Sequence, residues 1–229
     1  MRVLYISQLA DPADPRRGAA MLEVERMPGI LRGFGLDHVF HDATLSPPPL
    51  PDGFDAVIMG GSFGSANDTE PWRLALREWL LAHPDVPFFG ICGGHQLLAK
   101  AHGAELEACP ASQIGVYPLE LCGVPGFQGR VLQLHHERVA AAPPGATVWA
   151  TDDMGIQALR FGPCQWTFQF HPEMDEELAN EAASASGHDA SAWSDLDRAV
   201  ASGRAVVEAW IAAVRGRRED TAATGPQPA

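Results

Sequence analysis

The chain of 229 residues has few basic side chains and no long apolar run. It holds 16 Lys and Arg against 29 Asp and Glu, a net charge of −13, and its one basic cluster (residues 215–218) is followed at once by two acidic residues. A nucleic-acid surface needs clustered Lys and Arg, so we expect no nucleic-acid partner. No apolar stretch approaches the roughly 20 residues that cross a bilayer, and the first residues lack the features of a secretory signal. The sequence therefore predicts a cytoplasmic protein without a membrane partner.

Metal-ligand and cofactor patterns are also missing. The four cysteines form no C-x-x-C pair and no regular framework, which argues against a zinc site or a disulfide scaffold. The run His135-His136-Glu137 has no second histidine cluster at ligand spacing and reads as a substrate-facing loop or an exposed turn. Gly60-Gly61-Ser62 lacks both the Gly-Lys-Ser/Thr ending of a phosphate loop and the G-x-G-x-x-G pattern. We therefore predict neither a metal nor a cofactor.

The first half of the chain alternates short apolar segments with amphipathic ones. Val3–Ser7, Phe54–Met59 and Val86–Ile91 have the apolar character of buried parallel strands. Helical patterns lie within Met21–Phe34, after Pro71 and over Gly94–Ala101. Alternating strands and helices with short links predict an α/β fold: a mainly parallel open sheet with helices on both faces, of the flavodoxin-like kind.

The second half of the chain has a different pattern of residues. After Gly103, strand-like pieces separated by Gly, Pro and Asp turns cover residues 114–121, 130–134, 147–150, 156–160 and 165–170. We expect a smaller β-rich portion here, followed by a final helix at about Asp195–Val214. The chain is interpreted as one domain over residues 1–215, with a disordered tail over residues 216–229.

Cys92 is the candidate nucleophile. It stands in Gly90-Ile91-Cys92-Gly93-Gly94, between a predicted strand and a predicted helix. A tight turn at this point projects the sulfur from the carboxyl edge of the sheet, and the N-terminus of the next helix favours a thiolate. The usual fate of a free cysteine is burial as a small apolar group. The flanking glycines and the preceding strand favour the nucleophile instead.

His171 and Glu173 are the candidate base and orienting acid. The segment Phe168–Phe170 is apolar and ends on His171, which places the imidazole at the same sheet edge as Cys92. Glu173, two residues later, is close enough in sequence to hold one tautomer of the ring. His95 competes for the role of base, but on a helix its side chain would point away from the attacked carbonyl group. The three residues Cys92, His171 and Glu173 supply the parts needed for acyl transfer through a thioester.

Two backbone amides are predicted to form an oxyanion hole. Gly60-Gly61-Ser62 follows a predicted core strand, so the N–H of Gly61 can face Cys92. The N–H of Gly93 follows the nucleophile directly. Acyl transfer needs two such donors, and the loss of one typically costs about 100- to 1,000-fold in rate.

These motifs resemble those of the class I, triad-type glutamine amidotransferases. The resemblance rests on Gly90–Gln96, Gly60–Ser62 and His171–Glu173, and is strongest to the amidotransferase domain of GMP synthase. It implies that Cys92 attacks the side-chain amide of glutamine, that ammonia leaves, and that water then hydrolyses the γ-glutamyl thioester. It also implies that the amino-acid end of the substrate is held by Gly61, Ser62, Gln96, His135, His136 and Glu137.

The chain departs from the family pattern at two places. Gly93 stands where the family usually has a larger residue, and His136-Glu137 replaces a more usual Gly-Asp. The second departure leaves room for a broader γ-glutamyl substrate. Three functions stay open: a glutaminase that supplies ammonia to a separate acceptor synthetase, a γ-glutamyl hydrolase of peptides or conjugates, and a non-catalytic regulatory module of the same fold.

Overall fold

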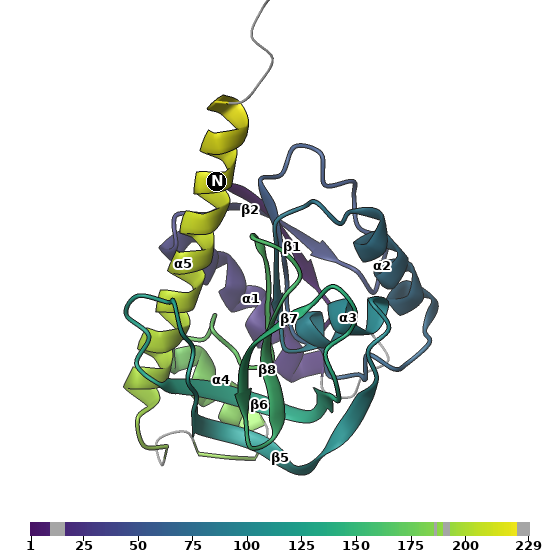
Figure 1. Ribbon diagram of the computed structural model, residues 1–229. Helices are drawn as coiled ribbons and strands as arrows, with labels where there is room; N and C mark the ends of the chain where they lie inside the picture. Colours follow the sequence, from purple (N-terminus) through teal and green to yellow (C-terminus); the bar gives the residue numbers. More distant parts are fainter. Residues whose placement is uncertain (10–16, 186, 190–192, 224–229) are drawn as a thin grey trace, which may run out of the picture.

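A seven-stranded sheet forms the centre of the protein (Figure 1). The structure, a computed structural model, describes residues 1–9, 17–185, 187–189 and 193–223. In sheet order the strands are β2 (Asp37–Asp42), β1 (Arg2–Ser7), β3 (Ala56–Met59), β4 (Phe88–Ile91), β9 (Gln165–Phe168), β8 (Gly155–Arg160) and β7 (Thr147–Asp152). The first five are parallel to one another, and β8 and β7 extend the sheet beyond β9 with antiparallel pairs. The predicted mainly parallel sheet is confirmed.

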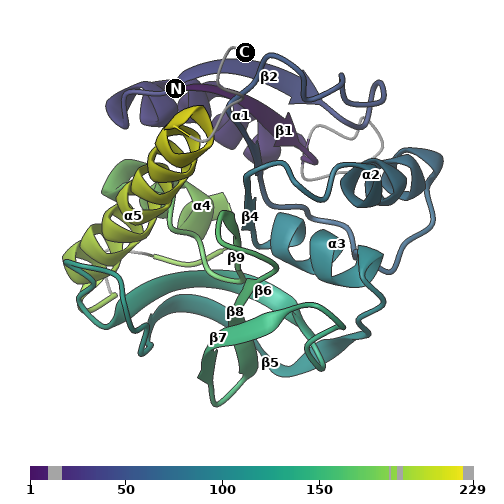
Figure 2. The ribbon, with the colours of Figure 1, turned by 45° about the horizontal axis from the view of Figure 1, so that its top comes forward.

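Helices cover both faces of this sheet, also as predicted. Figure 2 shows α1 (Arg17–Gly33) and α5 (Leu196–Ala223) on one side, and α2 (Pro71–Ala82) and α3 (Gly93–Ala101) on the other. Successive side chains of a strand point to opposite faces. Val3 and Tyr5 of β1 therefore pack in the core beneath α1 and α5, whereas Leu4 and Ile6 pack beneath α2 and α3.

The β-rich second half adds a two-stranded antiparallel ribbon. It consists of β5 (Leu106–Pro118) and β6 (Arg130–Val139). Helix α4 (Glu176–Ala185), which the sequence did not predict, packs Leu178 against Leu132 of β6. The N–H of His171 donates to the carbonyl of Leu132 at 2.8 Å, so the segment after β9 is tied to β6. This bond brings the ribbon against the carboxyl edge of the main sheet.

Several strand predictions were incomplete. Strand β5 was expected at residues 114–121, but it covers Leu106–Pro118. Strand β2 was missed because it is an edge strand of polar character, Asp37-His38-Val39-Phe40-His41-Asp42, whose side chains are mostly half-buried. Strand β6 was expected to end near Leu134, but it continues to Val139. The expected loop at residues 135–137 is therefore wrong: these residues belong to a strand, paired with β5.

The end of the chain also differs from the expectation. Helix α5 was expected to end near Val214, but it continues through Ala223, so residues 216–223 of the expected tail are helical. Two arginines fasten this extension to the amino edge of the sheet. Arg217 donates to the carbonyl of Asp85 at 2.9 Å, and Arg218 forms an ion pair with Asp55. Residues 224–229 of the expected tail lie outside the described part of the chain.

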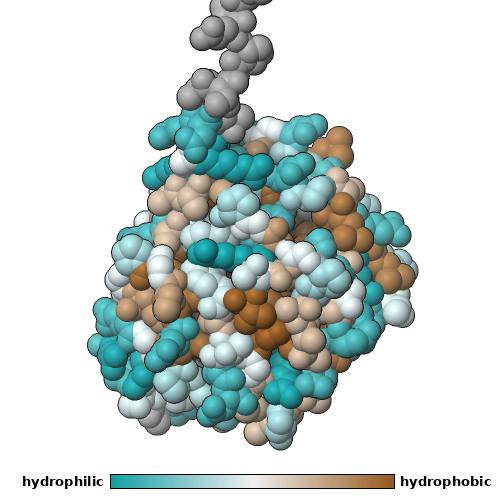
Figure 3. Space-filling view, viewed as in Figure 1, coloured by the Kyte–Doolittle hydropathy of each residue, from teal (hydrophilic) through white to brown (hydrophobic). Residues whose placement is uncertain are grey.

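Few large apolar side chains of the described residues are exposed. On the face shown in Figure 3, brown apolar groups stand apart from one another among hydrophilic residues. Among the described residues, the exposed large apolar side chains lie on the connection between β2 and β3, on α2 and on β7: Leu45, Leu50, Leu74, Leu81 and Val148. None of the described helices is long and apolar enough to cross a membrane.

Candidate active site

Cys92 occupies a sharp corner between β4 and α3. Its backbone has φ 49° and ψ −101°, a conformation that residues other than glycine rarely adopt and that costs about 1–3 kcal/mol. Two hydrogen bonds hold this corner. The N–H of Cys92 donates to the carbonyl of Phe168 at 2.8 Å, and the N–H of Gly94 donates to the carbonyl of Gly60 at 3.1 Å. The predicted turn is present, and it is anchored to the ends of β9 and β3.

Gly93 lets the segment after β3 approach the first turn of α3. A Cβ atom at Gly93 would lie 2.5 Å from the nitrogen of Ser62 and 2.9 Å from the carbonyl carbon of Gly61. No side chain fits at this position without movement of one backbone against the other. Because Gly93 begins α3, its N–H is among the first of the helix, which have no acceptor inside the helix. The two amides predicted for the oxyanion hole thus belong to backbone segments in direct contact.

His171 and Glu173 form a buried pair beside Cys92. The Nδ1 atom of His171 lies 2.8 Å from Oε1 of Glu173, and the two side chains are only 7% and 5% exposed. A Cβ built on Gly61 would lie 3.5 Å from Cε1 of His171 and 3.9 Å from Cβ of Cys92, so both residues border the same point. Helix α5 also closes on this segment, because a Cβ at Gly203 would lie only 2.6 Å from the carbonyl oxygen of Pro172.

The electrostatics of this group favour a charged imidazole. Burial alone lowers the pKa of His171, but the charges of Glu173 and Cys92 outweigh it and raise that pKa well above its ordinary value. Within the described residues, neither Nε2 of His171 nor Oε2 of Glu173 has a hydrogen-bond partner. The unpaired Nε2 is the atom that remains available for proton transfer, since Nδ1 is committed to Glu173.

Two buried glutamines link the sulfur to β6. The Nε2 of Gln169 lies 3.7 Å from Sγ of Cys92, and its Oε1 accepts from Nε2 of Gln96 at 3.1 Å. The same Nε2 of Gln96 donates to the carbonyl of Glu137 at 2.9 Å. Both bonds of Gln96 use its nitrogen, so its carbonyl oxygen is left as an acceptor.

The structure separates the three residues predicted at 135–137. His135 is buried, with Nδ1 3.1 Å from the carbonyl of Glu137 and Nε2 3.0 Å from Oε1 of Gln133. Burial lowers the pKa of His135 to about 4, so its ring is neutral at neutral pH. The Glu137 carboxylate accepts from the hydroxyl of Ser65 at 2.9 Å. His136, one position along the strand, is exposed and points to the opposite face of the ribbon.

The Ser62 hydroxyl is engaged by its own loop and by helix α2. It accepts from the N–H of Gly64 at 3.2 Å and from Nη1 of Arg73 at 3.3 Å. Of the predicted substrate-binding residues, Gly61, Gln96, His135 and Glu137 therefore lie in the network around Cys92. The side chains of Ser62 and His136 are directed elsewhere.

A family model described as glutamine amidotransferase class-I matches residues 34–185, more than half of the chain and all of the residues discussed above that surround Cys92. The protein belongs to the class-I glutamine amidotransferases. Its mainly parallel sheet, its cysteine corner and the segment after β9 all agree with the predicted resemblance.

Named relatives support the same assignment. The chain is 32% identical over 157 residues to a glutamine-hydrolysing GMP synthase subunit of Ignicoccus hospitalis, and the match covers 61% of this amidotransferase and 79% of that protein. It is 32% identical over 135 residues to aminodeoxychorismate synthase of Streptomyces griseus, but this match covers 55% of the chain and only 18% of that enzyme. The crystal structure of a glutamine amidotransferase from Thermotoga maritima shares the fold, with a TM-score of 0.69 and 23% identity over 95% of this chain and 97% of that one.

His95 does not compete with His171 in the folded amidotransferase. It is fully buried, and its Nδ1 atom lies 2.8 Å from the hydroxyl of Thr167 on β9. Burial and, to a lesser degree, the nearby His135 lower the pKa of His95 to about 3. It is a neutral packing residue between α3 and the sheet.

Sequence reasoning missed two polar residues of this site. Gln169 carried a usable signal: it is the single polar residue in the apolar run Phe168-Gln169-Phe170 that leads to His171. Arg73 carried none, because an arginine in an amphipathic helix is normally solvated. In the structure it is buried, bonds to Ser62 and pairs with Glu70 at 3.0 Å.

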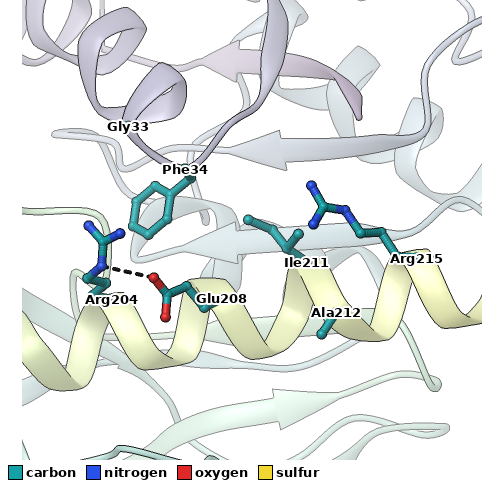
Figure 4. Close-up of a pocket in the computed structure, with 7 residues that line it drawn as sticks. All are labelled: Gly33, Phe34, Arg204, Glu208, Ile211, Ala212 and Arg215. Carbon is teal, nitrogen blue, oxygen red and sulfur yellow. Dashed lines mark ion pairs between the residues drawn. The ribbon is translucent and has the colours of Figure 1, made fainter.

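A surface pocket of about 190 Å³ lies away from this group, between the end of α1 and α5. Figure 4 shows Phe34 facing Arg204 and Ile211 across the pocket, with Glu208 paired to Arg204. None of the residues that line it belongs to the group around Cys92. The candidate site around Cys92 and this pocket are therefore separate places on the protein.

Proposed function

We propose that this protein hydrolyses the side-chain amide of glutamine through a γ-glutamyl thioester on Cys92 and releases ammonia. The observation that carries the proposal is the buried His171–Glu173 pair, whose imidazole borders the same point as the strained Cys92 corner. Membership of the class-I glutamine amidotransferases supports the choice of glutamine as the substrate.

In the first half of the reaction, the Cys92 thiolate attacks the amide carbon of glutamine. The N–H groups of Gly61 and Gly93 stabilise the negative charge on the former carbonyl oxygen. The His171 imidazolium then donates its Nε2 proton to the amide nitrogen, which leaves as ammonia. The raised pKa of His171 suits this step, because the ring holds a proton at neutral pH.

In the second half, water attacks the thioester. Neutral His171 accepts the proton from that water, glutamate is released, and the thiolate is restored together with the imidazolium. Throughout the cycle Glu173 holds the Nδ1 atom, which keeps Nε2 directed at the reacting groups.

Substrate recognition is assigned to the network between α3 and β6. The free carbonyl oxygen of Gln96 accepts from the α-ammonium group of the substrate, and the Glu137 carboxylate adds a negative charge nearby. Gly61 and Ser62 contribute through their backbone, because the Ser62 hydroxyl is engaged by Arg73. His135 packs behind this surface as a neutral ring, and His136 is too exposed to take part.

The ammonia acceptor is assigned to a separate protein. The GMP synthase relative of Ignicoccus hospitalis is named as one subunit of a larger enzyme, and this chain covers 79% of it. The matched part of aminodeoxychorismate synthase is only 18% of that enzyme. These proportions support an amidotransferase unit that works with a synthetase.

A γ-glutamyl hydrolase is the second candidate. It is favoured by the Glu137 carboxylate, which is partly engaged by Ser65 and stands where the family usually has an aspartate. A comparison of glutamine with γ-glutamyl dipeptides as substrates separates the two. A higher kcat/KM for glutamine supports the amidotransferase, and a higher value for the dipeptides supports the hydrolase.

Covalent labelling tests the proposal without an acceptor enzyme. A diazo-ketone analogue of glutamine is expected to modify Cys92, as located by peptide mass spectrometry, and Cys92→Ala is expected to abolish both labelling and ammonia release from glutamine. Cys109→Ala is the matched control, because that thiol lies near His135 at 3.6 Å but is not the proposed nucleophile. Labelling that persists in Cys92→Ala, or that disappears in Cys109→Ala alone, contradicts the assignment.

A further inference from the structure

Gln169 lies against the reacting sulfur, although the proposed reaction gives it no role. Its side chain is fully buried, and its Nε2 atom is 3.7 Å from Sγ of Cys92. We propose that Gln169 stabilises the Cys92 thiolate by a direct hydrogen bond, and that Gln96 and the carbonyl of Glu137 fix the orientation of its amide. Gln169 is then a catalytic residue, and Gln96 acts on the sulfur as a positioning residue.

The orientation follows from which atoms can donate. The carbonyl oxygen of Glu137 can only accept, so the side-chain atom of Gln96 at 2.9 Å from it must be the NH₂ group. That NH₂ group is also 3.1 Å from Gln169, whose facing atom must then be its carbonyl oxygen. The remaining end of the Gln169 amide, its NH₂ group, is directed at the sulfur. A reversed Gln169 amide would place two donors against each other at Gln96.

The contacts of the sulfur show when this bond becomes important. The carbonyl of Leu134 lies 3.8 Å from Sγ of Cys92, on the strand that also carries Glu137. A neutral thiol can donate its proton to this carbonyl. A thiolate has no proton to donate and needs donors, and Gln169 supplies one. The bond to Gln169 therefore strengthens as the thiol ionises, because hydrogen bonds to charged groups are about twice as strong as those between neutral groups.

The inference rests on the proposed function only in that Cys92 reacts as a thiolate, so it is tested with an electrophile that does not resemble glutamine. Iodoacetamide is added to the full chain at neutral pH, and the alkylation rate of Cys92 is followed by mass spectrometry of its peptide, apart from the other three cysteines. Gln169→Met, which keeps the volume but removes the donor, is expected to slow this rate about tenfold.

Gln96→Met tests the positioning role of Gln96, which we call the relay. Gln96 acts on the sulfur only by orienting the Gln169 amide. This variant is expected to slow alkylation less than Gln169→Met does, and the double variant is expected to be no slower than Gln169→Met alone. If the Gln169→Met chain does not fold, the alkylation rate of Gln96→Met alone tests whether the orientation of the Gln169 amide matters. Gln165→Met is the matched control: Gln165 begins β9, four residues before Gln169, and its amide donates to the carbonyls of Pro84 and Val86, away from Cys92.

The outcomes separate the two parts of the inference. A folded Gln169→Met protein whose Cys92 rate lies within about twofold of the wild-type rate overturns the role of Gln169. Effects of Gln96→Met and Gln169→Met that multiply in the double variant overturn the relay. A fall in the Gln165→Met rate equal to that of Gln169→Met overturns both, because it shows a general loss of packing. The alkylation rates do not depend on glutamine hydrolysis. A protein that does not hydrolyse glutamine therefore contradicts the proposed function alone.

Discussion

Gly93→Ala adds one methyl group at a tight backbone contact next to Cys92. The new Cβ would lie 2.5 Å from the nitrogen of Ser62, 2.7 Å from its Cβ and 2.9 Å from the carbonyl carbon of Gly61. Ordinary contacts of this kind begin at 3.4 Å, so the segment after β3 and the first turn of α3 must separate by about 0.9 Å. None of the three atoms is the flexible end of a side chain, so backbone has to move.

The size of the effect follows from this displacement. Overpacking of this kind costs about 1–3 kcal/mol, and the replacement of a helical glycine by alanine returns up to about 1 kcal/mol. We therefore expect a net loss of about 1–2 kcal/mol in the free energy of unfolding. The displaced backbone carries the N–H of Gly61, a proposed oxyanion donor. A misplacement of about 1 Å at a reacting centre can cost about 100-fold, so kcat for ammonia release is expected to fall by about that factor.

Ammonia release from glutamine and urea unfolding measure the two effects. Gly216→Ala is the matched control, because Gly216 lies in α5 and a Cβ there meets no atom within 4 Å. This control is expected to keep wild-type activity and to gain up to about 1 kcal/mol of stability. A Gly93→Ala protein that keeps both the kcat and the stability of the wild type would show that the contact with Ser62 relaxes without consequence and that Gly93 is not needed at this position.

Three further changes have defined outcomes. Glu173→Gln is expected to lower kcat on the order of 10³-fold. Because it removes a charge that raises the pKa of His171, it is also expected to move the high-pH limb of the activity profile to lower pH. A high-pH limb at the wild-type position would contradict this role of Glu173. Burial lowers the pKa of His95 to about 3. Between about pH 6.5 and pH 3 the unfolded chain therefore binds a proton on this ring that the folded protein does not, and stability decreases as the pH decreases. Between about pH 7 and pH 5, the free energy of unfolding measured with urea should drop by about 2 kcal/mol less in His95→Gln than in the wild type. Equal drops in the two proteins would contradict the lowered pKa of His95. Gly203→Ala places a Cβ 2.6 Å from the carbonyl oxygen of Pro172 and is expected to cost about 1–3 kcal/mol, whereas unchanged stability shows that α5 can shift freely.

The parallel core of the fold was predictable because its strands are apolar on both faces. Val3–Ser7 and the strand before Cys92 are buried runs bounded by small residues, a pattern that few other structures produce. Strand β2 lacks this pattern, since an edge strand with half-buried side chains tolerates Asp and His. The extension of α5 depends on Arg217 and Arg218 reaching carbonyl and carboxylate groups far away in sequence, which no local pattern records.

The candidate site was predictable where its residues form short motifs in the sequence. The glycines around Cys92 and the short spacing from His171 to Glu173 identify residues that the structure brings to one point. The orientation of individual side chains was not predictable, because it is set by tertiary contacts. Ser62 is turned toward a buried arginine, and Gln169 is directed at the sulfur by a chain of hydrogen bonds that begins on another strand.

Hydroxylamine traps a γ-glutamyl thioester on Cys92, if the reaction passes through one. A γ-glutamyl thioester partitions between water and this stronger nucleophile even when it does not accumulate. With glutamine as substrate, we predict that γ-glutamyl hydroxamate forms at the expense of glutamate as hydroxylamine is raised, and that Cys92→Ala forms neither product. Glutamate as the only product at every hydroxylamine concentration, with ammonia release undiminished in Cys92→Ala, would contradict the account.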